Sequence, residues 1–317
     1  MIKILVIILI IFINITKTFS QDIYCFIKSK DLKQMNDVID GFTSSFPDGK
    51  KVILDLEGED DSEQVNKFIS STKPSVIISL GALAAKASIQ FEKKIPIIFS
   101  MIINYKRHDF LKQDNVTGIS MEIPAQSLFT QFKMLIPQID SIGVPYHPIT
   151  SSEIVSDAIK DSNKLNIKLV EIQVQNPNNI DNDLSGHISE YKGLWMIADT
   201  KLYNLKTKSL SKLIFFAKEN KKPLLAFSEA FLKSGALFSI SINYRGIGSQ
   251  LALISRKLVQ DKTPIKEIPI SIPIGTYTVL NKDIAHALIG KNIDEATFDN
   301  VDKIYSQESE EKENDEL

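Results

Sequence analysis

Two carboxylates, Asp199 and Glu229, stand directly after apolar runs and are the first candidates for chemistry in this sequence. Asp199 follows Leu194–Ala198, and Glu229 comes shortly after Leu224–Phe227. Such a pair can act as general acid and base. The sequence implies no activated nucleophile or water for them, however, and it lacks a GxSxG elbow, a GxxxxGK[ST] phosphate loop and a GxGxxG turn. We therefore expect a protein that is not an enzyme.

Other polar, aromatic and small residues follow further apolar runs in the same way. They are Gly81 and Ala82, Tyr146, Thr200, Ser228 and Asn243. Gly81 opens an alanine-rich segment that favours a helix. In parallel sheets, ligands bind at the carboxyl ends of the strands, where loops lead into helix N-termini. The pattern predicts a ligand site at one sheet edge.

The elements that position these residues are short apolar runs rich in β-branched side chains. We predict strands at 23–27, 52–56, 76–80, 95–101, 142–144, 167–174, 194–198, 224–227 and 237–242. Runs of four to eight such residues are typical of strands that are buried on both faces.

Segments with helical spacing alternate with these runs. One apolar stripe lies within 32–42, a second within 128–136 and a third within 247–258. Strand–helix alternation predicts an α/β protein with doubly wound parallel sheets. The length of 317 residues allows two such sheets.

Composition excludes several classes of protein. The chain is 43% hydrophobic and 24% charged, which is typical of a globular protein. Its formal net charge of −2 shows no excess of basic residues of the kind that binds nucleic acid. Cys25 is the single cysteine, so an intrachain disulfide is excluded, and the four histidines form no i,i+4 pair. We expect no metal and no cofactor.

The N-terminus resembles a secretory signal. Lys3 precedes the apolar run Ile4–Ile13, which is too short to span a bilayer. We predict a signal peptide over 1–20, cleavage after Ser20 and a periplasmic protein. An uncleaved anchor is one alternative. Lipidation of Cys25 is another, which the bulky preceding Tyr24 disfavours.

The C-terminus is strongly acidic. Gln307–Leu317 reads QESEEKENDEL and contains no apolar segment long enough to bury. Such composition favours disorder. We expect an acidic disordered tail over 301–317.

A series of short motifs, in the same order along the chain, resembles the sequence pattern of a substrate-binding family of ABC transporters. Asn115-Val116-Thr117-Gly118-Ile119-Ser120 and Ile142-Gly143-Val144-Pro145-Tyr146 are similar to its NVTG…IGV-Y-NP pattern; Ala198-Asp199-Thr200, Pro223–Glu229, Ser234–Leu237, Asn243-Tyr244 and Ile268-Pro269 are similar to later motifs. The family includes tryptophan/tyrosine-type solute-binding proteins of the type I periplasmic-binding fold.

The resemblance implies a clamshell of two lobes joined by three hinge strands, which closes on a small molecule and delivers it to a membrane permease. The lobes would be 22–118 plus 243–262, and 119–242 plus 263–300. The ligand contacts that it implies are Gly81, Ala82, Ser100, Tyr146, Asp199, Thr200, Ser228, Glu229 and Asn243. Asp199 or Glu229 would bind an ammonium group, N–H groups near Ala82 a carboxylate, and Tyr146 a flat ligand.

The chain departs from the family pattern within this set. Asn243 and Glu229 stand where the family has aspartate, and Pro145 and His147 flank the tyrosine. Asp199 and Ser228 precede helical segments, so helix capping is the alternative role for both. We expect a monomer that binds an amino-acid-like molecule, aromatic ones included. A ligand-sensing module that signals to a membrane receptor kinase is the alternative function.

Overall fold

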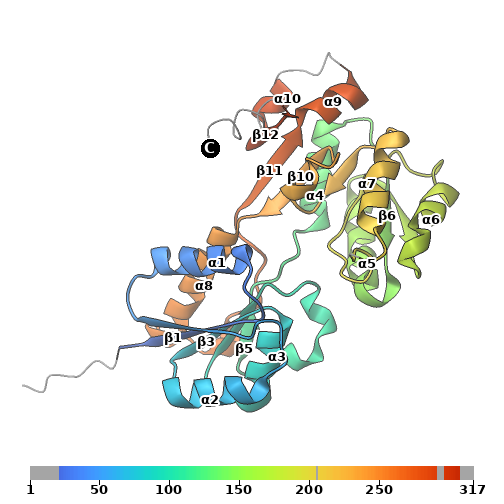
Figure 1. The fold of residues 1–317 in the computed structure, drawn as a ribbon. Helices are drawn as coiled ribbons and strands as arrows, with labels where there is room; N and C mark the ends of the chain where they lie inside the picture. The colour runs from blue at the N-terminus through green and yellow to red at the C-terminus, as the bar shows by residue number, and fades with distance from the viewer. Residues whose placement is uncertain (1–20, 205, 291–295, 308–317) are drawn as a thin grey trace, which may run out of the picture.

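Two β-sheets organise the chain, and each forms the middle layer of one lobe (Figure 1). The computed structural model describes residues 21–204, 206–290 and 296–307. The predicted signal peptide and most of the predicted acidic tail lie outside these ranges. Each of the nine runs predicted as strands overlaps a strand of the structure, and the α/β class with two doubly wound lobes is confirmed.

Lobe 1 contains a five-stranded parallel sheet in the order β2-β1-β3-β4-β5. Its strands are β1 (Ile23–Lys28), β2 (Lys50–Asp55), β3 (Val76–Leu80), β4 (Ile97–Ser100) and β5 (Val116–Gly118). Its helices are α1 (Lys33–Ser45), α2 (Ser62–Thr72), α3 (Ala82–Phe91) and α8 (Tyr244–Val259), with short 3₁₀ turns η1 (Tyr105–Arg107) and η2 (Asp109–Leu111).

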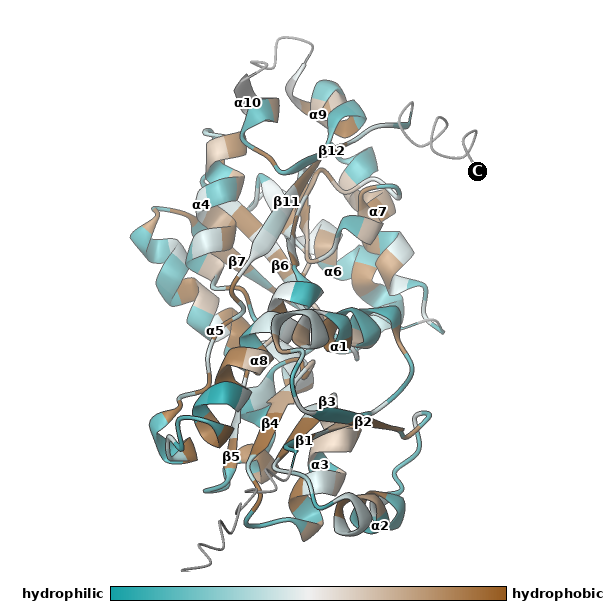
Figure 2. Cartoon of the chain, turned by 90° about the vertical axis from the view of Figure 1, so that its left-hand side faces the viewer, coloured by the Kyte–Doolittle hydropathy of each residue, from teal (hydrophilic) through white to brown (hydrophobic). Residues whose placement is uncertain are grey.

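Alternation along β1 shows why helices cover both faces of this sheet. Tyr24 and Phe26 pack in one core with α1 and α8, whereas Cys25 and Ile27 pack in the other core with α2 and α3. Cys25 is fully buried and free. Its position favours a core thiol over a lipid attachment site. Figure 2 shows the hydrophobic residues of β1, β4 and β5 inside this lobe.

Helix α8 joins lobe 1 from late in the sequence by close contact with α1. A Cβ atom on Gly248 would lie 2.0 Å from the backbone oxygen of Val38, and one on Gly41 would lie 2.1 Å from that of Arg245. Glycine at both positions therefore lets the two backbones approach.

Lobe 2 contains a seven-stranded sheet in the order β12-β11-β10-β9-β8-β6-β7. Its strands are β6 (Ser141–Tyr146), β7 (Lys168–Gln173), β8 (Gly193–Trp195), β9 (Leu224–Ala226), β10 (Phe238–Ile242), β11 (Thr276–Asn281) and β12 (Lys303–Tyr305). Its helices are α4 (Ala125–Leu135), α5 (Pro148–Lys164), α6 (Ile180–Gly186), α7 (Ser209–Glu219), α9 (Lys282–Ile289) and α10 (Ala296–Asp299), with turns η3 (Pro177–Asn179) and η4 (Glu229–Phe231).

The C-terminal edge of this sheet differs from the prediction in two ways. Strand β11 runs antiparallel to β10, so the sheet is not wholly parallel. The tail predicted over 301–317 begins with an ordered strand, because β12 pairs with β11. Asp302 fixes this pairing, since its carboxylate accepts hydrogen bonds from the backbone N–H and the hydroxyl of Thr278.

Three connections cross between the lobes, as the resemblance implies. They are residues 119–124 after β5, 242–244 before α8, and 268–275 after the turn η5 (Ile265–Glu267). Ile119 forms a parallel bridge with Ser271, and the Thr117 hydroxyl donates to the Ile268 oxygen at 2.8 Å. Residues 263–268, which the sequence analysis placed in lobe 2, thus pack with lobe 1. No helix of the described residues is long and apolar enough to cross a bilayer.

Candidate ligand-binding pocket between the lobes

A pocket of about 410 Å³ lies where the three connections meet both lobes. Lobe 1 contributes residues 103–106, which follow β4, and the first connection contributes residues 120–124. Lobe 2 contributes α5 and the carboxyl ends of β8, β9 and β10. The sequence predicts a ligand site at such strand ends, and the pocket occupies them in lobe 2.

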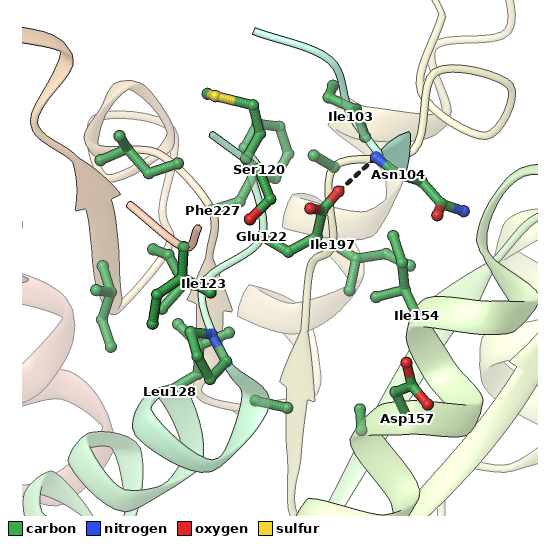
Figure 3. Close-up of a pocket in the computed structure, with 18 of the residues that line it drawn as sticks. Ile103, Asn104, Ser120, Glu122, Ile123, Leu128, Ile154, Asp157, Ile197 and Phe227 are labelled. Atoms are coloured by element: carbon green, nitrogen blue, oxygen red, sulfur yellow. Dashed lines mark hydrogen bonds between the residues drawn. The ribbon is translucent and has the colours of Figure 1, made fainter. Parts of the chain in front are cut away.

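Apolar and aromatic side chains form most of the pocket wall (Figure 3). Trp195 packs edge-on against Phe129, with the ring centroids 5.0 Å apart, which holds the indole in place. Ile154 and Ile197 lie beside the centre of the view in Figure 3, and Phe227 is partly exposed. A wall of this kind suits a ligand with a flat apolar body.

Glu122, on the first connection, is the polar group at the centre of this apolar wall. One of its carboxylate oxygens, Oε1, accepts a hydrogen bond from the backbone N–H of Asn104 (Figure 3). The other, Oε2, is shielded from solvent and has no hydrogen-bond partner among the described residues. Burial raises the pKa of the Glu122 carboxyl above its ordinary value.

The segment after β4 carries lobe 1 across to lobe 2. Asn104 adopts a left-handed backbone conformation, with φ of 48°. Its side-chain amide donates to the backbone oxygen of Thr150 on α5 at 2.9 Å. Lys106 pairs with Asp157 on the same helix at 2.9 Å. The pocket is therefore closed on one side by direct contacts between the lobes.

Charges at the pocket are mostly negative. Glu153, Asp157 and Asp161 recur every four residues on α5 and line it together with Glu122. Lys106 is the one lysine or arginine among the described lining residues, and its ammonium is paired with Asp157. This balance favours a cationic group on the ligand.

Of the nine residues proposed from the sequence, Ser228 lines this pocket. Its hydroxyl accepts from the backbone N–H of Ala230 at the start of η4. Glu229 lies one residue further from the pocket: it accepts from the Tyr277 hydroxyl at 3.1 Å and pairs with Lys303 at 3.4 Å. Because Tyr277 lines the pocket, Glu229 positions a wall residue.

Asp199 is engaged inside lobe 2. It is 3% exposed, and its carboxylate accepts hydrogen bonds from five donors. These donors are the backbone N–H groups of His147, Lys201 and Leu202 and the hydroxyls of Thr150 and Ser151. Such an arrangement gives Asp199 a structural role, but it does not cap a following helix, because residues 200–202 form a turn and α7 begins at Ser209. Thr200 is exposed beside it.

Tyr146 and Asn243 also have partners within the protein. The Tyr146 ring is buried, and its hydroxyl donates to Glu171 at 2.8 Å. Burial, together with this hydrogen bond, raises the pKa of Tyr146 to about 12. The Asn243 side chain caps α8 by accepting from the backbone N–H of Gly246 at 3.0 Å.

Gly81, Ala82 and Ser100 lie together at the carboxyl edge of the lobe 1 sheet. Gly81, with φ of 93°, leads from β3 into α3, and its N–H donates to the Ser100 backbone oxygen at 2.9 Å. The Ser100 hydroxyl is buried without a partner among the described residues. The Ser29 hydroxyl accepts from the backbone N–H of Ala84. These residues stand outside the pocket lining.

Sequence reasoning missed Glu122 and Asn104. A signal for Glu122 exists, since it is the single charged residue between Asn115 and Phe132. Asn104 carries no comparable signal, because its role depends on a contact with Thr150 that joins two lobes. Among the described residues, no cluster of three or more histidine, cysteine or acidic side chains is arranged to hold a metal ion.

Two doubly wound lobes, three crossing connections and a pocket at their junction define a two-lobed ligand-binding protein. The chain belongs to the family described as ABC transporter substrate binding protein, whose model matches residues 56–296. Proteins of this family bind solutes and are not enzymes.

A relative and two solved structures illustrate the similarity. A tyrosine-binding protein of Clostridioides difficile is 24% identical over 275 residues, which cover 83% of this chain and 77% of the relative. A ligand-free, open substrate-binding protein with adhesive properties from Clostridium difficile has a TM-score of 0.74 at 20% identity, over 90% of this chain and 100% of that one. An ABC domain in complex with L-tryptophan from Streptococcus pneumonia has a TM-score of 0.63 at 18% identity, over 89% and 100%.

Proposed function

We propose that this protein captures an amino-acid-like small molecule, with aromatic amino acids as the first candidates, and delivers it to the permease of an ABC transporter. The observation that carries the proposal is the pocket between the lobes, which combines an aromatic and apolar wall with carboxylates. The tyrosine-binding relative and the tryptophan-bound neighbour support the ligand class.

Binding requires the lobes to close over the ligand. The pocket receives residues from both lobes, so a ligand held there contacts both and favours the closed arrangement. We propose that the connections at 119–124, 242–244 and 268–275 act as the hinge. Gly81, Ala82 and Ser100, at the carboxyl edge of the lobe 1 sheet, then approach the ligand from the opposite side.

The protein would act outside the cytoplasmic membrane, in the periplasm, after removal of residues 1–20. The intact mass of the exported protein tests this step. A mass that corresponds to a chain starting near Gln21 supports it, and retention of Met1–Ser20 or an added lipid contradicts it.

Calorimetry with L-tyrosine, L-tryptophan and L-phenylalanine tests the ligand class, and mass spectrometry of the small molecule released by denaturation widens the search. Small-angle scattering tests closure, since the radius of gyration should decrease at saturating ligand. If no amino acid binds and the released molecule has no amine, the proposed ligand class is wrong. An unchanged radius with bound ligand contradicts the hinge motion.

A further inference from the structure

Only one of the two carboxylate oxygens of Glu122 accepts a hydrogen bond within the described residues. Its Oε1 atom accepts from the backbone N–H of Asn104, which ties the first connection to the segment after β4. Its Oε2 atom is shielded from water and has no hydrogen-bond partner among the described residues, although the nearby backbone N–H groups of Met121 and Glu122 lower the pKa of the carboxyl in part. Holding Asn104 needs one oxygen, so a purely structural role leaves the second unexplained.

An unsatisfied carboxylate oxygen is costly in apolar surroundings. A buried acceptor without a donor loses the free energy of its hydration, and the loss is larger for a charged group. Apolar residues such as Ile103, Ile123 and Ile197 share the pocket lining with Glu122. A donor that enters the pocket would compensate this cost.

The protein supplies no free cation for this purpose within the described pocket lining. Lys106 is the one lysine or arginine there, and its ammonium lies 2.9 Å from the Asp157 carboxylate. The aromatic side chains of Trp195, Phe227 and Tyr277 line the same pocket, and aromatic faces attract cations. A positively charged nitrogen on the ligand matches both features.

We propose that Glu122 is the specificity-determining residue of this pocket and that its Oε2 atom binds the ammonium group of the ligand. The inference rests on the proposed function and deepens it, because it assigns recognition of the amine to the hinge. Asp199, which the sequence favoured for this role, already has five internal donors.

The position of Glu122 also links recognition to movement. It lies on the first connection, between β5 and α4, and its Oε1 atom holds Asn104, whose side chain contacts Thr150 on α5. An ammonium group at Oε2 would therefore bind at a point that touches the hinge and both lobes. A ligand without an amine can fill the apolar wall but lacks this contact.

The test compares three ligand sets by calorimetry on the full mature chain. The first set is L-tyrosine and L-tryptophan, the second is tyramine and tryptamine, and the third is the deaminated acids 3-(4-hydroxyphenyl)propionate and indole-3-propionate. The wild type should bind the amine-bearing ligands roughly tenfold or more tightly than the deaminated acids, because charge-assisted hydrogen bonds are the strong ones.

Glu122→Gln keeps the shape of the side chain and removes its charge. It should weaken binding of the amine-bearing ligands by roughly tenfold or more and leave the deaminated acids within about threefold, so that the preference collapses. Glu219→Gln removes the same charge from an exposed residue on α7, outside the pocket lining, and reports the general effect of charge. This control should weaken binding of the amine-bearing ligands by less than about threefold.

The outcomes separate this inference from the proposed function. If the wild type binds amino acids and their deaminated acids equally, or if Glu122→Gln keeps the preference, the inference is wrong and the proposed function stands. If none of the three sets binds the wild type, the aromatic ligand class of the proposed function is wrong, and the inference is wrong with it. Should Glu122→Gln fail to fold, Glu122→Asp keeps the charge, shortens the reach and must still reduce the preference.

Discussion

The ammonium of Lys106, which follows β4 in lobe 1, lies 2.9 Å from the carboxylate of Asp157 on α5 in lobe 2. Beside this ion pair, the Asn104 side chain donates to the Thr150 backbone oxygen on the same helix at 2.9 Å. The two lobes are thus joined by direct side-chain contacts as well as by the three connections. Both side chains of the ion pair are about half exposed, whereas Asn104 is 5% exposed.

The buried contact should matter more than the ion pair. Asn104→Ala removes the hydrogen bond to Thr150 and places alanine at a left-handed φ of 48°. We expect the free energy of unfolding to fall by about 1–3 kcal/mol. Lys106→Ala removes a solvent-screened pair and should cost at most about 1 kcal/mol. Urea denaturation of both variants measures the difference, and a larger loss for Lys106→Ala would contradict this ranking.

Asp199→Asn distinguishes a structural role from ligand contact. The amide nitrogen cannot accept a hydrogen bond, so it leaves at least one of the backbone donors, His147 or Leu202, without its partner. We expect the ligand-free protein to lose about 1–3 kcal/mol of stability. Thermal denaturation without ligand measures the loss. An unchanged melting temperature together with weaker ligand binding would restore Asp199 as a ligand contact.

Gly248→Ala should disrupt the packing of α8 on α1. The added methyl group would lie 2.0 Å from the Val38 oxygen, so the helices must separate. We expect a loss of about 1–3 kcal/mol or more in the free energy of unfolding. Gly186→Ala is the matched control, because a Cβ atom at this helical glycine meets nothing within 4 Å. Equal stability of the two variants would show that the close approach is dispensable.

Binding of an amine should weaken in acid. Burial raises the pKa of Glu122 in the free protein, so its carboxyl is protonated at a pH where an exposed glutamate is still ionised. As the pH falls through this raised pKa, the partner for the ammonium is lost and the dissociation constant increases. The backbone N–H groups of Asn104, Glu122 and Met121 oppose the shift in part, and the charge of Lys106 opposes it to a smaller extent.

Calorimetry from neutral to acidic pH measures this effect, and Glu122→Gln should show a flatter profile. The stability of the ligand-free protein should change with pH in the opposite direction from ligand affinity. Because the folded pKa lies above the unfolded value, ionising Glu122 lowers stability as the pH rises from the unfolded to the folded pKa. A wild-type affinity that stays constant down to the range where exposed carboxyls titrate would contradict the role of Glu122.

The sequence by itself determined the elements and the class of the fold. Runs such as Val76–Leu80 and Leu237–Ile242 carry enough adjacent β-branched and apolar residues to specify buried strands without help from distant contacts. It also identified the family, because ordered motifs such as Asn115-Val116-Thr117-Gly118 extend along most of the chain. The strands depend on residues that are adjacent in the sequence, and the family match is the sum of separate short motifs, so neither requires knowledge of distant contacts.

Tertiary structure decided which polar residues are available for a ligand. Asp199 follows a strand as a ligand contact would, but the fold brings donors from 147–151 and 201–202 onto both of its oxygens. Glu122 has no motif of its own, and the same fold surrounds it with apolar residues and provides a partner for one oxygen. The number of partners that a carboxylate finds depends on segments that are distant in sequence, and no spacing along the chain encodes it.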